Sequence, residues 1–257
     1  MIEYFPFYFI SLLMSIYTIY FKNKYSSVMM SFIFIYLVFF AGFRFYTGTD
    51  YHSYYRLFEV ATPILDGLNY GYEFFEIGFR VLTSIIKQFS DNFVVYFIVL
   101  AFIPIYLIFI AIKEYPVNKY LVFFMFYTTF YLSYVFNAMG QAIVMGIFVY
   151  SLKYFLKFDT LKILLISIFS TFIHTSGIFI ILSYSLYRII LKLNLDYWFW
   201  ILLILSFISA KVRLLESIGN IFFPHYIYVY TEMRSESVSL FQLTSKLVIL
   251  LLLYFFI

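Results

Sequence analysis

The 257-residue sequence contains no cysteine and few charged residues, and each shortage excludes a class of protein. Without cysteine there is no disulfide, no thiolate nucleophile and no cysteine-based metal site. Charged residues make up 12% of the chain, whereas soluble domains contain about 25%. The apolar share is correspondingly large, because 65% of the residues are hydrophobic and 26% are aromatic. The composition predicts a membrane protein, and the net charge of +4 is too weak and scattered to indicate nucleic acid as a partner.

Uncharged apolar runs divide the chain into candidate membrane spans. A bilayer core about 30 Å thick needs about 20 helical residues, because a span must satisfy its own backbone hydrogen bonds. The expected spans are 4–21, 26–43, 93–112, 120–136, 138–152, 163–187, 195–210 and a shortened one over 247–257. No linker or internal repeat separates them. The sequence therefore predicts an all-α fold, a polytopic transmembrane helical bundle that forms one integral membrane domain over 1–257.

The distribution of Lys and Arg predicts which loops face the cytoplasm. Nine of the 17 basic residues lie in four short connectors, and eight lie in two long polar segments, 44–92 and 211–246. Because basic residues concentrate in cytoplasmic loops, we expect the short connectors inside and the long segments outside. The run 163–187 must then enter the membrane and return, as a re-entrant hairpin or two half-helices that turn at 174–177. The alternative is one ordinary span, which inverts everything after it.

The outer segment 44–92 is expected to begin as a loop and to end as a helix on the membrane surface. Residues 44–55 are rich in Gly, Thr, Tyr and Asp and show no apolar period. Residues 73–88 carry an apolar stripe at helical spacing, as an interfacial helix does. The stripe consists of Phe75, Phe79, Leu82 and Ile86.

Charged residues at a membrane boundary are costly and therefore point to function. Arg44 follows the second span, where its guanidinium can bind a phosphate or a carboxylate, or can anchor the helix end by snorkelling. Asp50 can pair with Arg44, accept a proton, or start a turn after Gly48.

Three further groups have two interpretations each. Glu73 and Glu76 suit general acid or base catalysis if a low dielectric raises their pKa, or they are solvated acids. His174, within an apolar run, is a hydrogen-bonded packing residue or part of a proton relay. Asn137 and Gln141 follow a tight outer turn, where they bind sugar hydroxyls or satisfy the backbone of the turn. The three histidines fall in separate segments, so we expect no metal site.

Taken in order, four short motifs resemble the EpsG family of polytopic membrane proteins, which are similar to the Wzy-type polymerases of O-antigen, capsule and exopolysaccharide. The resemblance extends from about Arg44 to His174, and it departs from the family pattern Asn-x-x-Arg-Gln at Gly140, which stands in the Arg position. The motifs are Arg44…Gly48-x-Asp50-Tyr51-x-x-Tyr54, Glu76-Ile77-Gly78-Phe79, Asn137-x-x-x-Gln141 and His174-Thr175-Ser176.

The resemblance implies a glycosyltransferase of the bacterial inner membrane, and we expect it to need neither a metal nor a cofactor. Such a polymerase moves a glycan from one undecaprenyl diphosphate carrier to a sugar hydroxyl of the next lipid-linked repeat unit, at the outer face. The expected partners of such a polymerase are the undecaprenyl-diphosphate-linked oligosaccharide and membrane lipid. The resemblance also suggests a protein that regulates chain length as a partner.

The resemblance also implies roles for individual residues. Arg44 is expected to hold the carrier diphosphate, Asp50 or Glu76 to activate the acceptor hydroxyl, and His174 to support proton transfer. The residues expected to contact sugars are Tyr51, Tyr54, Asn137 and Gln141. Aromatic rings suit that role, because they offer an apolar face to a sugar ring.

Two rival functions come from other classes. A flippase or exporter of the same lipid-linked oligosaccharide favours inverted repeats with broken helices in matching halves, and the sequence shows one such break. A membrane acyltransferase that decorates the glycan needs a His or a His–Asp pair, and His174 is the residue that offers itself.

Overall fold

The computed structural model describes residues 13, 26–67, 74–114, 119, 122 and 126–192. Two compact units are distinguished, Met1–Arg188 and Ile189–Ile257, and the account below concerns the first. The predicted spans over 4–21, 195–210 and 247–257, the predicted outer loop 211–246 and Glu73 lie outside the described residues. The prediction of a single polytopic domain therefore stays a prediction.

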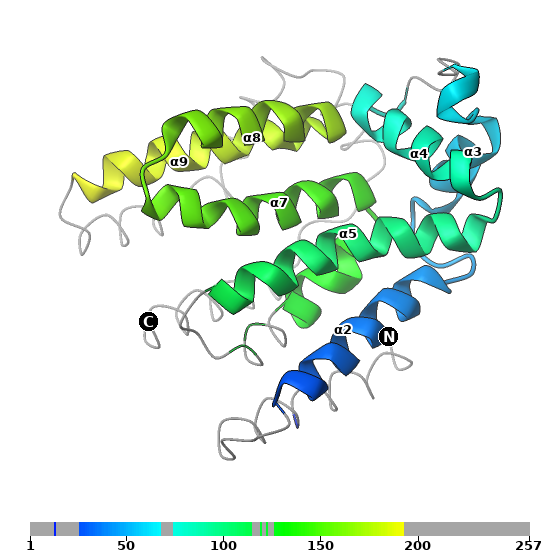
Figure 1. Ribbon diagram of the computed structural model, residues 1–257, viewed down its shortest axis with the longest axis horizontal. Coiled ribbons are helices and arrows are strands. Elements are labelled where there is room, and N and C mark those ends of the chain that lie inside the picture. The colour runs from blue at the N-terminus through cyan, green and yellow to red at the C-terminus, as the bar shows by residue number, and fades with distance from the viewer. Residues whose placement is uncertain are drawn as a thin grey trace, which may run out of the picture. The chain divides into compact units, whose positions relative to one another are not determined.

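The regular elements in the described part of the chain are all helices (Figure 1). In chain order they are α2 (Ser26–Gly42), α3 (Tyr51–Val60), η2 (Ile64–Asp66), α4 (Ile77–Phe89), α5 (Phe93–Glu114), η3 (Tyr127–Val135), α7 (Met139–Leu156), α8 (Thr160–Ile173), η4 (Thr175–Gly177) and α9 (Ile178–Leu191). η2 and η4 are single 3₁₀ turns, and η3 is a π-helix, a rare form that occurs often at functional sites. The expectation of an all-α fold is confirmed for these residues.

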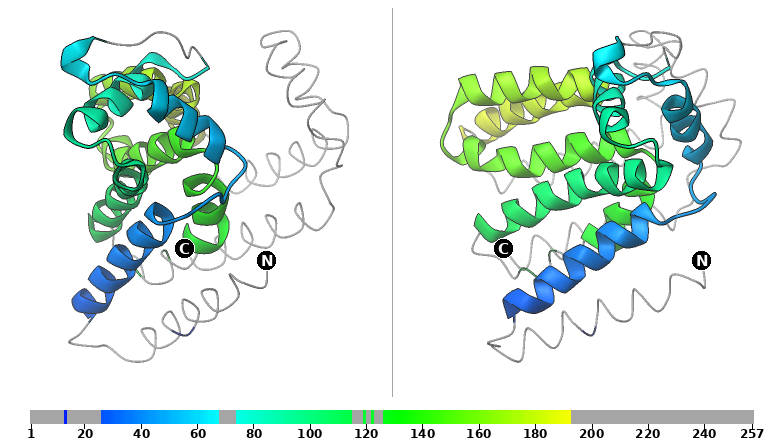
Figure 2. Two further views of the ribbon diagram at one scale, coloured as in Figure 1. Left: turned by 90° about the vertical axis from the view of Figure 1, so that its right-hand side faces the viewer. Right: turned by 45° about the vertical axis from the view of Figure 1, so that its right-hand side comes forward.

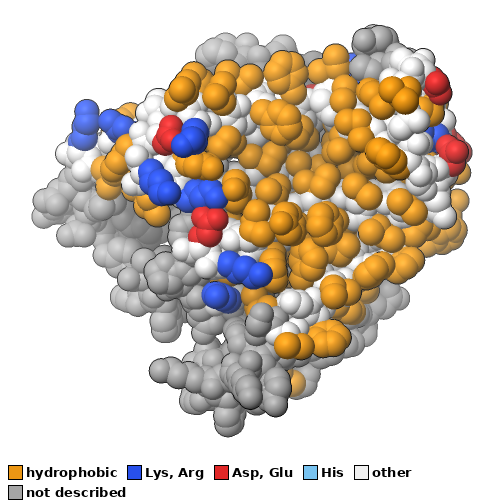
Figure 3. Space-filling model, viewed as in Figure 1, with side chains coloured by type: hydrophobic (Ala, Val, Ile, Leu, Met, Phe, Trp, Pro, Cys, Tyr) orange, Lys and Arg blue, Asp and Glu red, His pale blue; other side chains and the backbone are white. Residues whose placement is uncertain are grey.

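Two of the described helices, α5 and α7, are long and apolar enough to cross a membrane, with 22 and 18 residues. At about 1.5 Å per residue they measure about 33 and 27 Å, which matches a bilayer core of about 30 Å. Large apolar side chains cover much of the face drawn in Figure 3. On α8, for example, Leu165 and Phe169 are more than half exposed. Such a surface is suited to contact with lipid.

α5 lies between α2 and α7, and α7 packs on its other side against α8 (Figure 1). Gly146 of α7 sits against the backbone of Pro104 in α5, where a Cβ atom would lie 3.0 Å from the proline Cα. A residue without a side chain is needed for this close approach, as is common where membrane helices cross. The start of α7 lies near the start of α5, because Arg44 contacts both Phe97 and Met139.

The apolar run 163–187 is divided between α8 and α9, with the break at 174–177. The two helices run antiparallel, because the chain reverses at the break and the Thr160 hydroxyl at the start of α8 lies 2.9 Å from the Tyr184 hydroxyl in the middle of α9. Each helix has 14 residues and measures about 21 Å, short of a bilayer core of about 30 Å. The polar break therefore forms the turn of a helical hairpin.

The first half of segment 44–92 is more helical than expected. α3 begins at Tyr51, within the stretch interpreted as a loop. Its buried face is formed by Tyr51, Tyr54, Leu57 and Phe58. These residues have helical spacing. The stretch 44–55 ends before Leu57 and Phe58, so it does not contain the full helical pattern.

The second half of this segment also differs from the expectation. α4 begins after Glu76, and the predicted stripe faces inward, with Phe79 fully buried and Ile86 6% exposed. The stripe therefore packs against neighbouring helices, and the expectation that this helix lies on the membrane surface stays a prediction. An amphipathic pattern reports that one face is apolar, and it does not distinguish lipid from a neighbouring helix.

Candidate functional site

The four sequence motifs meet around the turn that leads from η3 into α7. Segments 44–54, 76–79, 136–141 and 174–176 lie at the same end of the helices, the end that faces the viewer in the left view of Figure 2. The carbonyl groups of this turn and its amide groups bind different side chains, so the turn is contacted from two sides.

Arg44 binds the carbonyl side of this turn. Its Nη1 donates to the carbonyl oxygens of Val135, at 2.9 Å, and of Phe136, and its Nη2 donates to the Met139 sulfur at 3.2 Å. Its guanidinium carbon lies 4.2 Å from the centre of the Phe97 ring. The last carbonyls of a helix have no partner within the helix, so Arg44 caps η3.

The positive charge of Arg44 is buried without a counter-ion among the described residues. The side chain is 7% exposed, and its Nε has no hydrogen-bond partner. Burial lowers the pKa of Arg44 to about 10, a value at which the group stays charged at neutral pH. A desolvated cation bound only to neutral acceptors makes the potential of the surrounding site positive.

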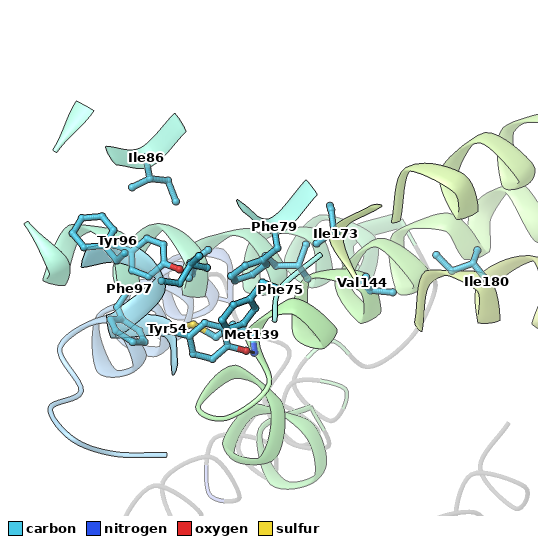
Figure 4. Packing of buried hydrophobic residues seen from close by; sticks show 14 of the residues in the cluster. Tyr54, Phe75, Phe79, Ile86, Tyr96, Phe97, Met139, Val144, Ile173 and Ile180 are labelled. Carbon is cyan, nitrogen blue, oxygen red and sulfur yellow. Dashed lines mark hydrogen bonds between the residues drawn. The ribbon is translucent and has the colours of Figure 1, made fainter. Parts of the chain in front are cut away.

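Tyr54 binds the amide side of the turn. Its hydroxyl accepts a hydrogen bond from the backbone N–H of Met139 at 2.8 Å, and the two residues lie next to each other in Figure 4. The Tyr51 ring stacks on Phe97 with 5.3 Å between ring centres and 8° between planes. Both tyrosines are 3% exposed, and this burial favours a packing role over direct contact with a sugar.

Asn137 joins the turn to the segment after Arg44. Its Oδ1 accepts from the backbone N–H of Thr49 at 2.8 Å, and its Nδ2 donates to the Ser133 carbonyl at 3.1 Å. Gly48 lies directly against the turn with φ 103°, where a Cβ atom would overlap the carbonyl oxygen of Phe136. Asn137 and Gly48 thus hold the segment 44–50 against the turn, which is the backbone-satisfying role that the sequence left open for Asn137.

Gly48→Ala is therefore expected to destabilise the protein more than Gly67→Ala does. Both glycines have positive φ, but a Cβ at Gly67 meets nothing within 4 Å. The left-handed conformation costs about 1–3 kcal/mol at either position, and the overlap with the turn is added at Gly48 alone. Thermal unfolding of the two variants in the same detergent should give the lower Tm for Gly48→Ala. Equal Tm values would mean that the 44–50 segment does not press on the turn.

Asp50 lies at the start of α3 and is partly buried. Its Oδ1 accepts from the Thr49 hydroxyl at 3.1 Å. Burial raises the pKa of Asp50, and the hydrogen bond from Thr49 and the charge of Arg44 oppose that rise. The carboxyl forms no ion pair with Arg44, so the two groups interact only at a distance.

Glu76 and His174 are brought together although they are almost a hundred positions apart in the sequence. α4 begins directly after Glu76, and α8 ends directly before His174. The Glu76 carboxylate accepts from the Thr175 backbone N–H at 2.9 Å, and the same oxygen lies 3.9 Å from Nε2 of His174. The two side chains are 22% and 24% exposed. They form a partly desolvated carboxylate–imidazole pair that solvent still reaches.

The imidazole of His174 is oriented by the turn in which it lies, between α8 and η4. Its Nδ1 accepts from the Ser176 backbone N–H at 3.1 Å and lies 2.9 Å from the Ser176 hydroxyl. Burial lowers the pKa of His174, and the neighbouring Glu76 opposes that effect. Ser176 was part of a sequence motif, but its role in holding the ring was not visible from the sequence.

The model of the EpsG family matches residues 27–257. The chain belongs to the EpsG family. It is therefore a membrane protein of polysaccharide biosynthesis. Comparison with curated proteins and with solved structures gave no match.

Gly140 and Gln141, two positions of the third sequence motif, lie in the first turn of α7. Gln141 is partly exposed there. Gly140 is buried, and a Cβ at this position would lie 3.2 Å from Cδ2 of His174 and 3.6 Å from Cδ2 of Phe79. In this EpsG protein, the imidazole of His174 thus lies directly against the position of the missing side chain. Within the described ranges, no three potential metal ligands gather.

Proposed function

We propose that this EpsG protein polymerises oligosaccharide repeat units carried on undecaprenyl diphosphate. The observation that carries the proposal is the Glu76–His174 pair at the helix start that Arg44 and Tyr54 hold in place. A general base beside a positive potential is what the transfer of a glycan from a diphosphate to a hydroxyl needs.

The distribution of basic residues supports a site at the outer face. Lys113, Lys153, Lys162 and Arg188 lie at the ends of α5, α7, α8 and α9 that are remote from the site. Most of the Lys and Arg side chains visible in Figure 3 lie in its left half. Basic residues in short connectors are typical of the cytoplasmic side, and this supports an outer location for the opposite end, with Glu76 and His174.

In the proposed reaction, the bond between the sugar anomeric carbon and the diphosphate breaks while a new bond forms to the acceptor oxygen. The acceptor hydroxyl transfers its proton to the carboxylate of Glu76, and the carrier leaves as undecaprenyl diphosphate. Negative charge builds up on the leaving diphosphate. Because Arg44 is buried, it stabilises that charge through its field and not by direct contact, together with the positive end of α7.

Aromatic contact with the sugars is assigned to exposed rings beside the site. Tyr46 is 63% exposed, and its ring centre lies 5.4 Å from that of the exposed His52. Rings of this kind offer one apolar face and a polar edge to a sugar. In this assignment the buried Tyr51 and Tyr54 position Arg44 and α7, while Tyr46 and His52 meet the substrate.

Deletion of the gene tests the proposal against its two rivals. A polymerase defect leaves single repeat units on the cell surface, and plasmid-borne protein restores the ladder of chain lengths. Loss of all repeat units from the surface would indicate the flippase or exporter. A normal ladder that lacks acyl groups would indicate the acyltransferase. Gel electrophoresis of the extracted glycan, with chemical analysis of its acyl content, separates the three results.

A further inference from the structure

We propose that Gly140 is a positioning residue, which leaves room for His174 to act as a neutral hydrogen-bond donor in the reaction. The proposal rests on the proposed polymerase function for the reaction that His174 serves, but the placement of the ring stands on geometry alone. It also accounts for the glycine at position 140, where a side chain would meet the imidazole.

The space at Gly140 is already filled by its neighbours. A Cβ atom there would lie 3.2 Å from Cδ2 and 3.7 Å from Cβ of His174, and 3.6 Å from a ring carbon of Phe79. The shortest of these distances is tighter than an ordinary van der Waals contact. An alanine would force the imidazole to shift by a fraction of an ångström, and an arginine would displace it. The imidazole of His174 can therefore occupy its position only because residue 140 has no side chain.

The hydrogen bonds around His174 determine which ring nitrogen carries the proton. The backbone N–H of Ser176 can only donate, so Nδ1 is the acceptor in that 3.1 Å bond. A neutral imidazole with an unprotonated Nδ1 carries its proton on Nε2. Nε2 is the atom that faces the Glu76 carboxylate at 3.9 Å. His174 thus presents an N–H to the site, and a group that presents an N–H is a donor and not a base.

The charges around the ring favour this neutral form. The first turn of α7, against which the ring lies, is the positive end of a helix, and Arg44 adds a buried positive charge at the same turn. Burial of the ring is the largest effect that disfavours an imidazolium, these two charges act in the same direction, and Glu76 opposes them. Glu76 and His174 then have separate tasks. Glu76 takes the acceptor proton, and His174 keeps its own proton and donates a hydrogen bond to an oxygen of the departing diphosphate.

The placement of the proton can be measured on the full chain without any reaction. The protein contains three histidines, His52, His174 and His225, so ¹⁵N-histidine NMR of the protein in lipid nanodiscs gives few signals, and His174→Gln identifies the one to follow. The expected signal is an unprotonated Nδ1 with a protonated Nε2. Gly140→Ala should shift this signal, and Gly140→Arg should remove the chemical-shift signature of the hydrogen bond at Nδ1. A protonated Nδ1 in the wild type, or an unchanged signal in Gly140→Arg, overturns the proposal.

A pair of amide variants tests the donor role. The amide nitrogen of Gln lies close to the position of Nε2, and that of Asn lies close to the position of Nδ1, and neither amide can act as a base. His174→Gln should retain polymerisation within about tenfold of wild type, while His174→Asn should lose about 100-fold or more, the range for removal of one charge-stabilising donor. Equal loss in both variants contradicts the donor role. If the wild type itself does not polymerise, the proposed function fails, and the NMR result still decides the placement of His174.

Discussion

Arg44→Ala is expected to abolish both the glycan ladder and most of the folded protein. The substitution leaves the carbonyls of Val135 and Phe136 without their donor and empties the space beside Phe97. Each buried carbonyl without a donor costs about 1–3 kcal/mol, and the cavity adds to that cost. We expect a large fall in Tm in detergent and a polysaccharide that consists of single repeat units. A normal ladder at normal Tm would contradict the position of Arg44 at the centre of the site.

Two further variants separate the charge of Arg44 from its packing. Arg44→Lys keeps the charge but loses the guanidinium fork, and Arg44→Met keeps much of the volume but loses the charge. At equal amounts of folded protein, the lysine variant should produce longer glycan chains than the methionine variant, because the field acts on the departing diphosphate. Equal chain lengths would show that Arg44 has a structural role alone.

Glu76→Gln is expected to reduce the rate of polymerisation by about 10²–10⁴-fold, the usual contribution of a general base, with little change in Tm. The amide oxygen of glutamine can still accept the hydrogen bond from Thr175, so the turn keeps its partner. Glu114→Gln is the matched control. Glu114 forms a 3.0 Å ion pair with Lys153 at the opposite end of the helices, and exposed pairs contribute about 0–1 kcal/mol. Rates should be compared at equal amounts of folded protein.

Asp50→Asn decides between the two candidate bases. Burial raises the pKa of Asp50, which suits a base, but its Oδ1 is engaged with Thr49 and no imidazole lies within ion-pair distance of it. We expect this variant to retain at least a tenth of the wild-type rate. A loss as large as that of Glu76→Gln would move the base from Glu76 to Asp50.

The sequence was sufficient to predict the helices that carry long apolar runs. The runs 26–43 and 93–112 correspond to α2 and α5 within two residues at each end, because lipid requires uninterrupted apolar helix. The polar break at 174–177 falls at the turn between α8 and α9 for the same reason. α3 was missed because the stretch 44–55 ends before Leu57 and Phe58, which complete its buried face.

The candidate site was predicted as a set of residue types and not as an arrangement. The order of the motifs suggested that Arg44, Glu76 and His174 belong together. Only the structure shows that Arg44 is buried beneath the site and that it caps η3 through a hydrogen bond. The same is true of Gly140, which the resemblance marks as a departure from the family pattern and which the structure shows as space for an imidazole. Roles of this kind depend on which side chains bury one another, and the fold determines these contacts.

The most direct test of the central claim uses purified full-length protein in nanodiscs with a single lipid-linked repeat unit, without added metal. We expect a ladder of dimers and longer glycans on one carrier, with one undecaprenyl diphosphate released for each bond formed, and an almost complete loss of both products for Glu76→Gln. Wild-type protein that is folded by thermal unfolding but leaves the repeat unit unchanged would contradict the proposed function. An equal ladder from the wild type and Glu76→Gln would contradict the proposed site.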